Sequence, residues 1–231
     1  MNGLAVRCVG VGHVYHLDGQ DVLALEGIDL AIGAGATVAI VGPSGSGKST
    51  LMNLLAGLQR PTSGHLYIGE QQIAALSQNA LLRLRAEHLG VVVQNPSRNL
   101  LPFLDAAGNI RFAQRGPRSY GRRHLPEPDG LLRELGLDQL AGARVDRLSG
   151  GERQRLALAV GMAARPGVLL ADEPTSQLDT ANRDGVVELV NRISERYGTT
   201  VVAVTHDHDV AAGLSRTIAL HEGRLCPDAA A

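Results

Sequence analysis

A glycine-rich turn between an apolar run and a helix-compatible segment constrains the fold more than any other feature of the sequence. The apolar run is Thr-Val-Ala-Ile-Val at residues 37–41, which is typical of a strand buried on both faces. The turn follows at once and fits the pattern G-x-x-x-x-G-K-[ST]. Its residues are Gly42, Pro43, Ser44, Gly45, Ser46, Gly47, Lys48 and Ser49. This context predicts a loop that binds the phosphates of a nucleotide.

The residue types of this loop suit that chemistry. Small residues let backbone N–H groups approach phosphate oxygens, and the following helix directs its positive end at the same anion. Lys48 is expected to neutralise the β- and γ-phosphates, and the hydroxyl of Ser49 is a ligand for magnesium. The loop alone would equally suit a small-molecule kinase, a GTPase or a motor.

Composition excludes some partners. The 231 residues are 44% hydrophobic and carry 22 basic and 23 acidic side chains, so nothing resembles the basic footprint of a nucleic-acid binder. Cys8 and Cys226 form neither a metal nor a redox spacing, and we interpret them as reduced thiols in a cytosolic protein. No stretch approaches the roughly 20 apolar residues of a membrane span, and the N-terminus has no signal pattern. We therefore expect a soluble chain that reaches a membrane only through another polypeptide.

Apolar runs alternate with helix-compatible segments, which predicts the α/β class with a mostly parallel sheet and helices on its faces. Short strands separated by tight glycine turns are expected at residues 4–9, 22–25 and 28–32, and buried strands at residues 168–171 and 200–204. Helices are expected at residues 48–58, 80–85, 131–135 and 151–164. Residues 111–130 contain several arginines and prolines, and we interpret them as an exposed, solvated loop rather than a nucleic-acid contact.

A second helix start carries an unusual pair of glycines. Ser149 is a good N-cap, and Glu152 completes a capping box. A purely structural helix explains these two residues but not Gly150 and Gly151, which reduce helix stability. The tip therefore suggests a second phosphate-binding site, which would serve the nucleotide of a neighbouring subunit.

Residues 148–155 resemble the signature motif of the ATP-binding subunits of ABC transporters, and the resemblance covers essentially the whole chain. It implies a P-loop NTPase of the ABC type, with a mostly parallel core sheet, an N-terminal antiparallel β-subdomain and an inserted helical subdomain. Residues 1–231 would form one such domain, with the helical subdomain at about residues 95–165. In this family two domains stack head to tail. The resemblance thus implies that Ser149, Gly150 and Gly151 of one subunit contact the γ-phosphate held by residues from Gly42 to Thr50 of the other.

Polar residues at the ends of the predicted strands complete the expected site. Asp172 is expected to contact Mg²⁺ through water, and Glu173 to orient and deprotonate the attacking water. The resemblance implies that His206 contacts the γ-phosphate and that Gln94 joins the magnesium site to the helical region. The residues implied for binding ATP also include Tyr15, against adenine, and Asp179, in the loop through which subunits sense each other. The metal ligands implied are Ser49, Gln94 and Asp172.

Further segments resemble the group of macrolide exporters, lipoprotein-release ATPases and the cell-division ATPase. They are residues 51–55, 99–102 and 170–175, whereas Val93 and Ser176-Gln177 depart from that group. The apolar residues 100–104 lie where the family receives a short helix of its membrane subunit, although burial under the helical subdomain would also explain them. The implied partners are a second copy or homologous ATP-binding domain and an integral membrane permease, with no nucleic acid.

The resemblance thus implies an energy-coupling ATPase that is cytoplasmic and peripheral on the inner face of the cell membrane. An alternative keeps the ATPase but uses it for mechanical signalling, in cell-wall or lipoprotein machinery. Soluble relatives in DNA repair or translation carry two nucleotide domains or long coiled coils, and this sequence has neither.

Overall fold

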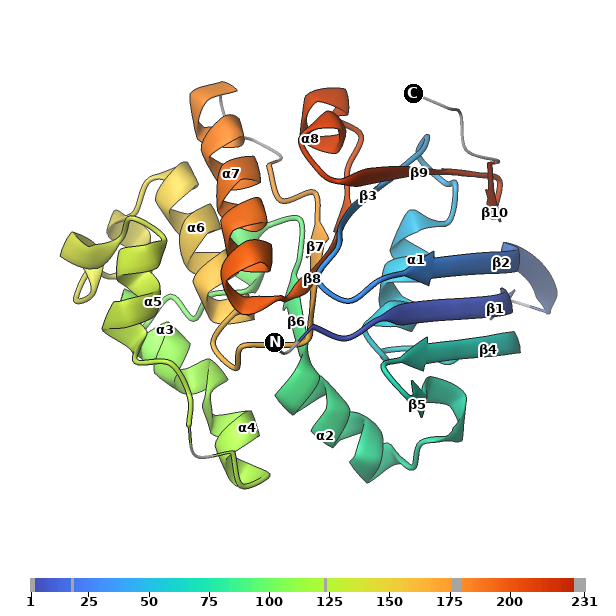
Figure 1. Cartoon of the computed structure of the whole chain (residues 1–231), viewed down its shortest axis with the longest axis horizontal. Helices are drawn as coiled ribbons and strands as arrows, with labels where there is room; N and C mark the ends of the chain where they lie inside the picture. Colours follow the sequence, from blue (N-terminus) through green and yellow to red (C-terminus); the bar gives the residue numbers. More distant parts are fainter. Residues whose placement is uncertain (1–2, 18, 123, 176–179, 227–231) are drawn as a thin grey trace.

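The computed structural model describes residues 3–17, 19–122, 124–175 and 180–226, without the side chains of residues 180–182. Its strands form two sheets, which occupy the centre and the right of Figure 1. The four-stranded sheet has the order β2-β1-β4-β5, with β1 Val6–Leu17, β2 Gln20–Ile32, β4 Ser63–Ile68 and β5 Gln71–Gln72. The six-stranded sheet has the order β10-β9-β3-β8-β7-β6. Its strands are β3 Thr37–Val41, β6 Leu89–Val92, β7 Val168–Asp172, β8 Thr200–Val204, β9 Arg216–His221 and β10 Arg224–Leu225.

The six-stranded sheet is mostly parallel, as the alternation of apolar runs and helices predicts. β3 pairs in parallel with β8 and β9, and β7 pairs in parallel with β6 and β8. β10 is the antiparallel edge strand, joined to β9 by a tight turn. The four-stranded sheet is antiparallel throughout its described pairings. These pairings confirm the predicted fold class.

Successive residues of the central strands belong to two different hydrophobic cores. In β3, Val38 and Ile40 pack in one core with the antiparallel sheet, whereas Ala39 packs in the other with the helices. Because neighbouring side chains of a strand point to opposite faces, the two cores lie on opposite faces of this sheet. Both faces are therefore covered, which is why β3 and β8 read as continuous apolar runs rather than alternating ones.

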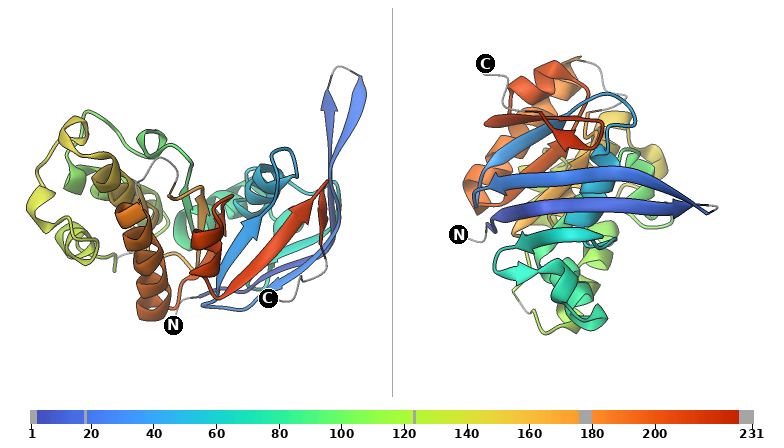
Figure 2. Two further views of the ribbon diagram at one scale, coloured as in Figure 1. Left: turned by 90° about the horizontal axis from the view of Figure 1, so that it is seen from above. Right: turned by 90° about the vertical axis from the view of Figure 1, so that its right-hand side faces the viewer.

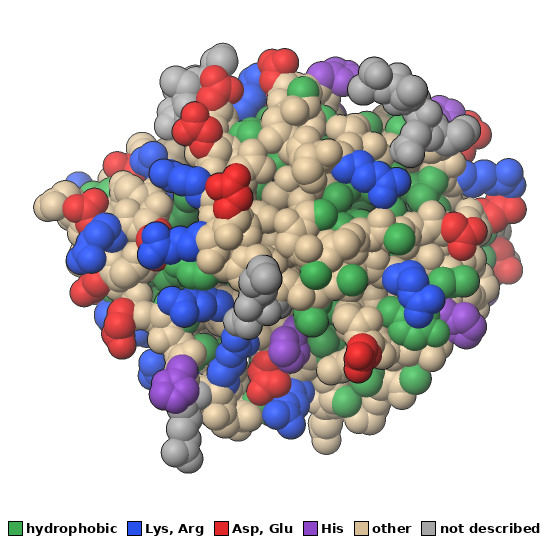
Figure 3. All heavy atoms as spheres, in the orientation of Figure 1, with side chains coloured by type: hydrophobic (Ala, Val, Ile, Leu, Met, Phe, Trp, Pro, Cys, Tyr) green, Lys and Arg blue, Asp and Glu red, His purple; other side chains and the backbone are tan. Residues whose placement is uncertain are grey.

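Helices provide the second layer. They are α1 Lys48–Leu55, α2 Gln78–His88, α3 Ala106–Ala113, α4 Arg115–Ser119, α5 Pro128–Glu134, α6 Gly150–Gly161, α7 Thr180–Tyr197 and α8 His208–Ala212. Short 3₁₀ turns occur at Ile73–Ala75, Pro96–Arg98, Asp138–Leu140 and Val145–Arg147. Helices α3 to α7 gather on the left of Figure 1, whereas α1 lies beside the antiparallel sheet. On this left side, basic and acidic side chains lie interspersed on the surface (Figure 3). None of the helices in the described ranges is both long and apolar enough to cross a bilayer.

The prediction of a loop at residues 111–130 was wrong at both ends of the segment and right only for the described residues between α4 and α5. The chain there ends α3, forms α4 and begins α5. Asp105 caps α3 by accepting from the backbone N–H of Gly108. The buried Gln114 amide then ties the connection down by donating to the carbonyls of Pro126 and Ala163. Charge density concealed this because the arginines occupy the solvent side of short helices whose other sides are apolar.

Residues 22–25 and 28–32 are in a strand as predicted, but the break expected between them is wrong, because β2 runs through both. Gly27, with φ of 59°, lies inside β2, and Gly10, with φ of 56°, lies inside β1 near register shifts of their pairing. These glycines permit irregularities within long strands rather than turns between short ones. The resulting β1–β2 hairpin projects from the body of the molecule (Figure 2). Helix ends also shift: α1 stops at Leu55, α2 extends to His88 and α6 stops at Gly161.

Candidate functional site

The site lies where four parallel strands end. β3, β6, β7 and β8 run side by side, so the residues that follow their carboxyl ends meet at one edge of the sheet, where α/β proteins bind ligands. A cavity of about 530 Å³ opens there. Its lining includes Tyr15, Val22, Leu23, Gly42, Ser44, Gly45, Gly47, Lys48, Ser49, Thr50, Gln94, Asp172, Glu173 and His206. Twelve of these are predicted site residues; Val22 and Leu23 are not.

The phosphate loop is built so tightly that only glycine fits at two positions. A Cβ atom on Gly42 would lie 2.1 Å from the carbonyl oxygen of Leu220, and one on Gly47 would lie 2.6 Å from that of Ala24. Ser46 is buried under the loop, and its hydroxyl has no hydrogen-bond partner among the described residues. Pro43 is exposed beside the cavity. A closely packed backbone and an unpartnered buried hydroxyl fit a loop that closes around an anion.

Lys48 begins α1 and extends back over the loop. Its ammonium donates to the carbonyl oxygens of Gly42 at 2.7 Å and Pro43 at 2.8 Å. These carbonyl oxygens hold the ammonium at the mouth of the loop, next to the N-terminus of α1. A phosphate bound there would be attracted by the charge of Lys48 and would accept hydrogen bonds from the N–H groups at the start of the helix. Lys48 is also the sole lysine in a sequence with 21 arginines.

Tyr15 forms one wall of the cavity, on β1. Its hydroxyl donates to Oε1 of Gln59 at 2.9 Å and lies 3.3 Å from Oγ1 of Thr50. Its register partner Val22 and the next residue, Leu23, are exposed apolar side chains on β2 that line the same cavity. Sequence reasoning missed this apolar wall because alternation in an edge hairpin does not reveal which side chains face a ligand.

Asp172 and Glu173 follow one another at the end of β7 but lie in different surroundings. Burial raises the pKa of Asp172 above its usual value, the charge of Glu173 raises it further, and Lys48 opposes both. Glu173 has a φ of 49°, in the left-handed region that a non-glycine residue adopts at a cost of about 1–3 kcal/mol. Its backbone N–H donates to the carbonyl oxygen of Val204 at 2.8 Å. This backbone turn directs the carboxylate toward the end of β8.

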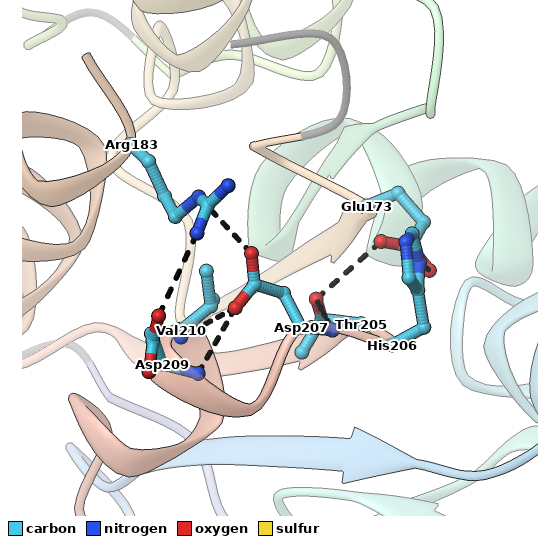
Figure 4. A network of polar contacts seen from close by, with 7 residues as sticks. All are labelled: Glu173, Arg183, Thr205, His206, Asp207, Asp209 and Val210. Atoms are coloured by element: carbon cyan, nitrogen blue, oxygen red, sulfur yellow. Dashed lines mark hydrogen bonds and ion pairs between the residues drawn. The ribbon is translucent and has the colours of Figure 1, made fainter. Parts of the chain in front are cut away.

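Both oxygens of the Glu173 carboxylate have partners from the end of β8. Nδ1 of His206 lies 2.7 Å from Oε1, and the buried hydroxyl of Thr205 donates to Oε2 at 3.4 Å (Figure 4). The imidazole of His206 remains largely exposed. The pair therefore presents an accessible ring against a buried carboxylate. Thr205 is a functional candidate that the sequence alone did not single out.

Three oxygen donors fit a hard divalent cation. Ser49, Gln94 and Asp172 line the same cavity, although they come from α1, the end of β6 and the end of β7. Hydroxyl, amide and carboxylate oxygens are ligands that Mg²⁺ accepts. The pKa of Asp172 is raised first by burial and then by the charge of Glu173, and a bound cation would favour the ionised carboxylate against both. Asn99 fixes the turn around Gln94 by accepting from the Val93 N–H and donating to the Val91 carbonyl.

The glycine-bearing tip of α6 lies outside this cavity. Ser149 caps the helix and Glu152 returns the bond, so the predicted capping box is present. The backbone N–H of Ser149 lowers the pKa of Glu152. Ser149 and Gly150 are exposed, and Ser149, Gly150 and Gly151 do not line the cavity that holds Lys48 within the described residues. Asp179 and residues 176–178 lie outside the described residues.

Sequence comparisons assign this arrangement to a family. Residues 25–176 match the family described as ABC transporter. The lipoprotein-releasing system ATP-binding protein LolD 1 of Caulobacter vibrioides is 38% identical over 95% of this chain and 94% of its own length. The macrolide export ATP-binding/permease protein MacB of Burkholderia thailandensis is 41% identical over 90% of this chain. The match covers only 32% of that longer polypeptide.

A solved structure has the same architecture. The ATP-binding cassette MJ0796, in a dimeric post-hydrolysis state bound to ADP and Pi, superposes with a TM-score of 0.84 and 33% sequence identity. The alignment covers 96% of this chain and 97% of that one.

Proposed function

Because the chain belongs to the ABC transporter family, we propose that it hydrolyses ATP at the cavity between β3 and β7 while paired head to tail with a second ATP-binding domain. The observation that carries the proposal is the separation of two anion-binding tips. The loop at Lys48 lines a cavity, and the exposed tip at Ser149 lies outside that cavity. A second subunit would bring its own Ser149 tip to this cavity.

In this proposal, different residues of the cavity bind the nucleotide and activate the attacking water. The backbone of the loop and the Lys48 ammonium bind the β- and γ-phosphates, and Tyr15 with Val22 and Leu23 provides an apolar surface for adenine. The Glu173 carboxylate accepts a proton from the attacking water, since it lines the cavity and is held in place by His206 and Thr205. His206 donates to the γ-phosphate from its exposed ring while Thr205 keeps Glu173 in place.

We assign the magnesium site to Ser49, Gln94 and Asp172, all of which line the cavity. The ion would shield the phosphate oxygens, which is the usual role of Mg²⁺ in phosphoryl transfer. Asp179 belongs to this proposal as a residue of the subunit interface. Residues 95–165, between β6 and β7, would act as the helical subdomain of a single domain spanning residues 1–231.

An exposed aromatic pair supports a membrane partner. Phe103 is 71% exposed and Phe112 is 48% exposed, whereas Leu100 is buried. The two aromatic residues line a hollow of about 500 Å³ together with Leu104, Arg111 and Arg115. Exposed aromatic side chains beside arginines are typical of protein interfaces. We propose that a cytoplasmic helix of an integral membrane permease binds here, which would place the chain at the inner face of the membrane.

The single lysine provides a direct test of nucleotide binding. An amine reagent should modify Nζ of Lys48 besides the α-amino group, and Mg-ATP should protect Lys48 alone. Mass spectrometry of the peptide that contains Lys48 measures the protection. Equal labelling with and without Mg-ATP would remove the nucleotide from this cavity.

The membrane partner is tested at Phe103. Phe103→Ser should keep the ATPase rate of the isolated chain but no longer co-purify with the permease from solubilised membranes. Val9→Ser, at an exposed apolar position of the antiparallel sheet, is the matched control. Retention of the permease by Phe103→Ser would place the interface elsewhere.

Mechanical signalling remains the second candidate function, because the same ATPase could act on a membrane protein that moves no substrate. Names of relatives include both a lipoprotein-releasing system and a macrolide exporter. The co-purified membrane protein decides between them: transport of a substrate in proteoliposomes supports the first function, and ATP-dependent activation of an external hydrolase supports the second.

A further inference from the structure

Arg183 forms an ion-pair link between α7 and the segment that carries His206. Its Nε lies 3.0 Å from Oδ2 of Asp207, and its Nη1 lies 3.6 Å from Oδ2 of Asp209 (Figure 4). Asp207 is mostly buried in this pair, whereas the Asp209 side chain is 83% exposed. The contact to Asp207 is therefore the stronger one, since exposed ion pairs contribute little.

Asp207 uses its other atoms to order the local backbone. Its Oδ1 accepts from the backbone N–H groups of Asp209 at 2.9 Å and Val210 at 3.4 Å, and so caps α8. Its own backbone N–H donates to Oγ1 of Thr205 at 3.0 Å. Arg183 takes no part in this cap, so α8 should remain folded when the ion pair is removed.

The hydroxyl group of Thr205 connects the backbone of Asp207 to the carboxylate of Glu173. A hydroxyl group carries a single proton, and its oxygen already accepts from the Asp207 N–H. That proton is donated to Oε2 of Glu173, 3.4 Å away. A shift of Asp207 would move the hydroxyl group of Thr205. It would also move His206, which lies between these two residues in the chain and contacts Oε1 of Glu173.

We infer that Arg183 is a positioning residue for hydrolysis: by holding Asp207, it keeps the partners of both Glu173 oxygens in place. This inference rests on the proposed role of Glu173 as the base. Arg183 does not line the nucleotide cavity, so it acts through Asp207 and not through ATP. Its effect should accordingly fall on kcat and leave KM unchanged, as for an interaction that matters only in the transition state.

Four variants test the inference. Arg183→Ala should lower kcat roughly tenfold, since small displacements of catalytic groups have effects of this size or larger. KM for ATP and the affinity for a fluorescent ATP analogue should stay within about twofold. Arg183→Lys should restore part of the loss, because it keeps a cation within reach of Asp207. Asp207→Asn retains the helix cap and should reproduce the loss. Asp209→Asn, at the exposed end of the link, should behave as wild type.

The double variant Arg183→Ala/Asp207→Asn tests whether Arg183 acts through Asp207. It should be no slower than either single variant, because both remove the same ion pair. Losses that multiply, an increase of KM in proportion to the loss of kcat, or an unchanged kcat in Arg183→Ala would each overturn the inference. If Arg183→Ala does not fold, Arg183→Gln retains most of the buried side-chain stem and is judged by the same kcat and KM criteria.

The Glu173→Gln background separates this inference from the proposed function. Arg183→Ala should cause no further loss of the residual turnover there, since no carboxylate remains to be positioned. A further tenfold loss in that background would overturn the positioning role and leave Glu173 as the base. Normal turnover of Glu173→Gln by itself would instead overturn the proposed function.

Discussion

Nδ1 of His206 lies 2.7 Å from Oε1 of Glu173, and the two side chains differ sharply in exposure. The imidazole is 72% exposed, whereas the carboxylate is 11% exposed. The histidine thus covers the acid from the solvent side, and Thr205 holds it from within the protein. Both side chains line the proposed nucleotide cavity.

Glu173→Gln should retain ATP binding and reduce hydrolysis by a factor of about 10²–10⁴, the usual contribution of a positioned base. Because ATP is bound but not cleaved, the variant should accumulate as a closed dimer with Mg-ATP. Phosphate release and size-exclusion chromatography with light scattering measure the two effects. Glu222→Gln is the matched control, since Glu222 also has a positive φ, of 46°, but lies in the turn before β10. Normal phosphate release by Glu173→Gln would exclude this base.

Asp172→Asn should make the nucleotide-free protein more stable at neutral pH while abolishing magnesium-dependent hydrolysis. The folded protein raises the pKa of Asp172, so the ionised carboxylate is disfavoured in the folded state above that pKa. Ionisation of Asp172 therefore lowers the free energy of unfolding by an amount that grows as pH rises through the raised pKa. This loss vanishes below the pKa of a free aspartate. Each 1 kcal/mol gained should raise Tm by roughly 2–4 °C in a chain of this size.

Calorimetry across a pH series checks this effect in the absence of nucleotide. The advantage of Asp172→Asn should shrink steadily on acidification. Asp184→Asn, at an exposed position of α7, is the control and should show no such trend. A lower Tm for Asp172→Asn at neutral pH would show that the ionised carboxylate stabilises the fold.

The two thiols should react very differently. Burial, together with the charge of Asp29, raises the pKa of Cys8 to about 12, whereas Cys226 is exposed. A thiol reagent at pH 8 should therefore modify Cys226 at once and Cys8 only after unfolding. Because the folded state keeps the Cys8 proton that the unfolded state loses, stability should also fall as pH rises above 9. Cys8→Ala should lose this part of the alkaline instability, and rapid labelling of native Cys8 would contradict the burial.

The sequence was sufficient for the parts of the fold that depend on local pattern. Buried strands such as β3 and β8 are continuous apolar runs, and the capping box of Ser149 and Glu152 can be recognised from the sequence. The parallel order of the strands then brings Gln94, Asp172 and His206 to one edge. The predictions for residues 111–130 and 22–32 were only partly right: arginines masked short helices in the first segment, and a glycine marked an irregularity inside a strand rather than a turn in the second.

Long-range contacts were the other limit. Nothing local indicates that Arg183 pairs with Asp207, that the Thr205 hydroxyl turns to Glu173, or that Glu173 adopts a positive φ. These relations depend on where β7, β8 and α7 lie relative to one another. The exposure of Phe103 beside the buried Leu100 is likewise a product of packing, since both belong to one apolar stretch.

In the proposed dimer, each active site joins the phosphate loop of one subunit to the Ser149 tip of another. Lys48→Ala removes the first half and Ser149→Arg removes the second. Each variant alone should be inactive, because every site of its dimer lacks one half. In an equal mixture, half of the dimers are mixed and contain one intact site, so independent sites predict about a quarter of the wild-type rate.

The double variant Lys48→Ala/Ser149→Arg, mixed with wild type, is the control for this experiment. Its mixed dimers place one defect in each site and should contribute no activity beyond that of the wild-type dimers alone. The decisive measurement is phosphate release by the mixture of the two single variants under Mg-ATP. Recovery to about a quarter of the wild-type rate supports a shared site. Full turnover by Ser149→Arg alone would contradict it, since the tip would then take no part in the reaction.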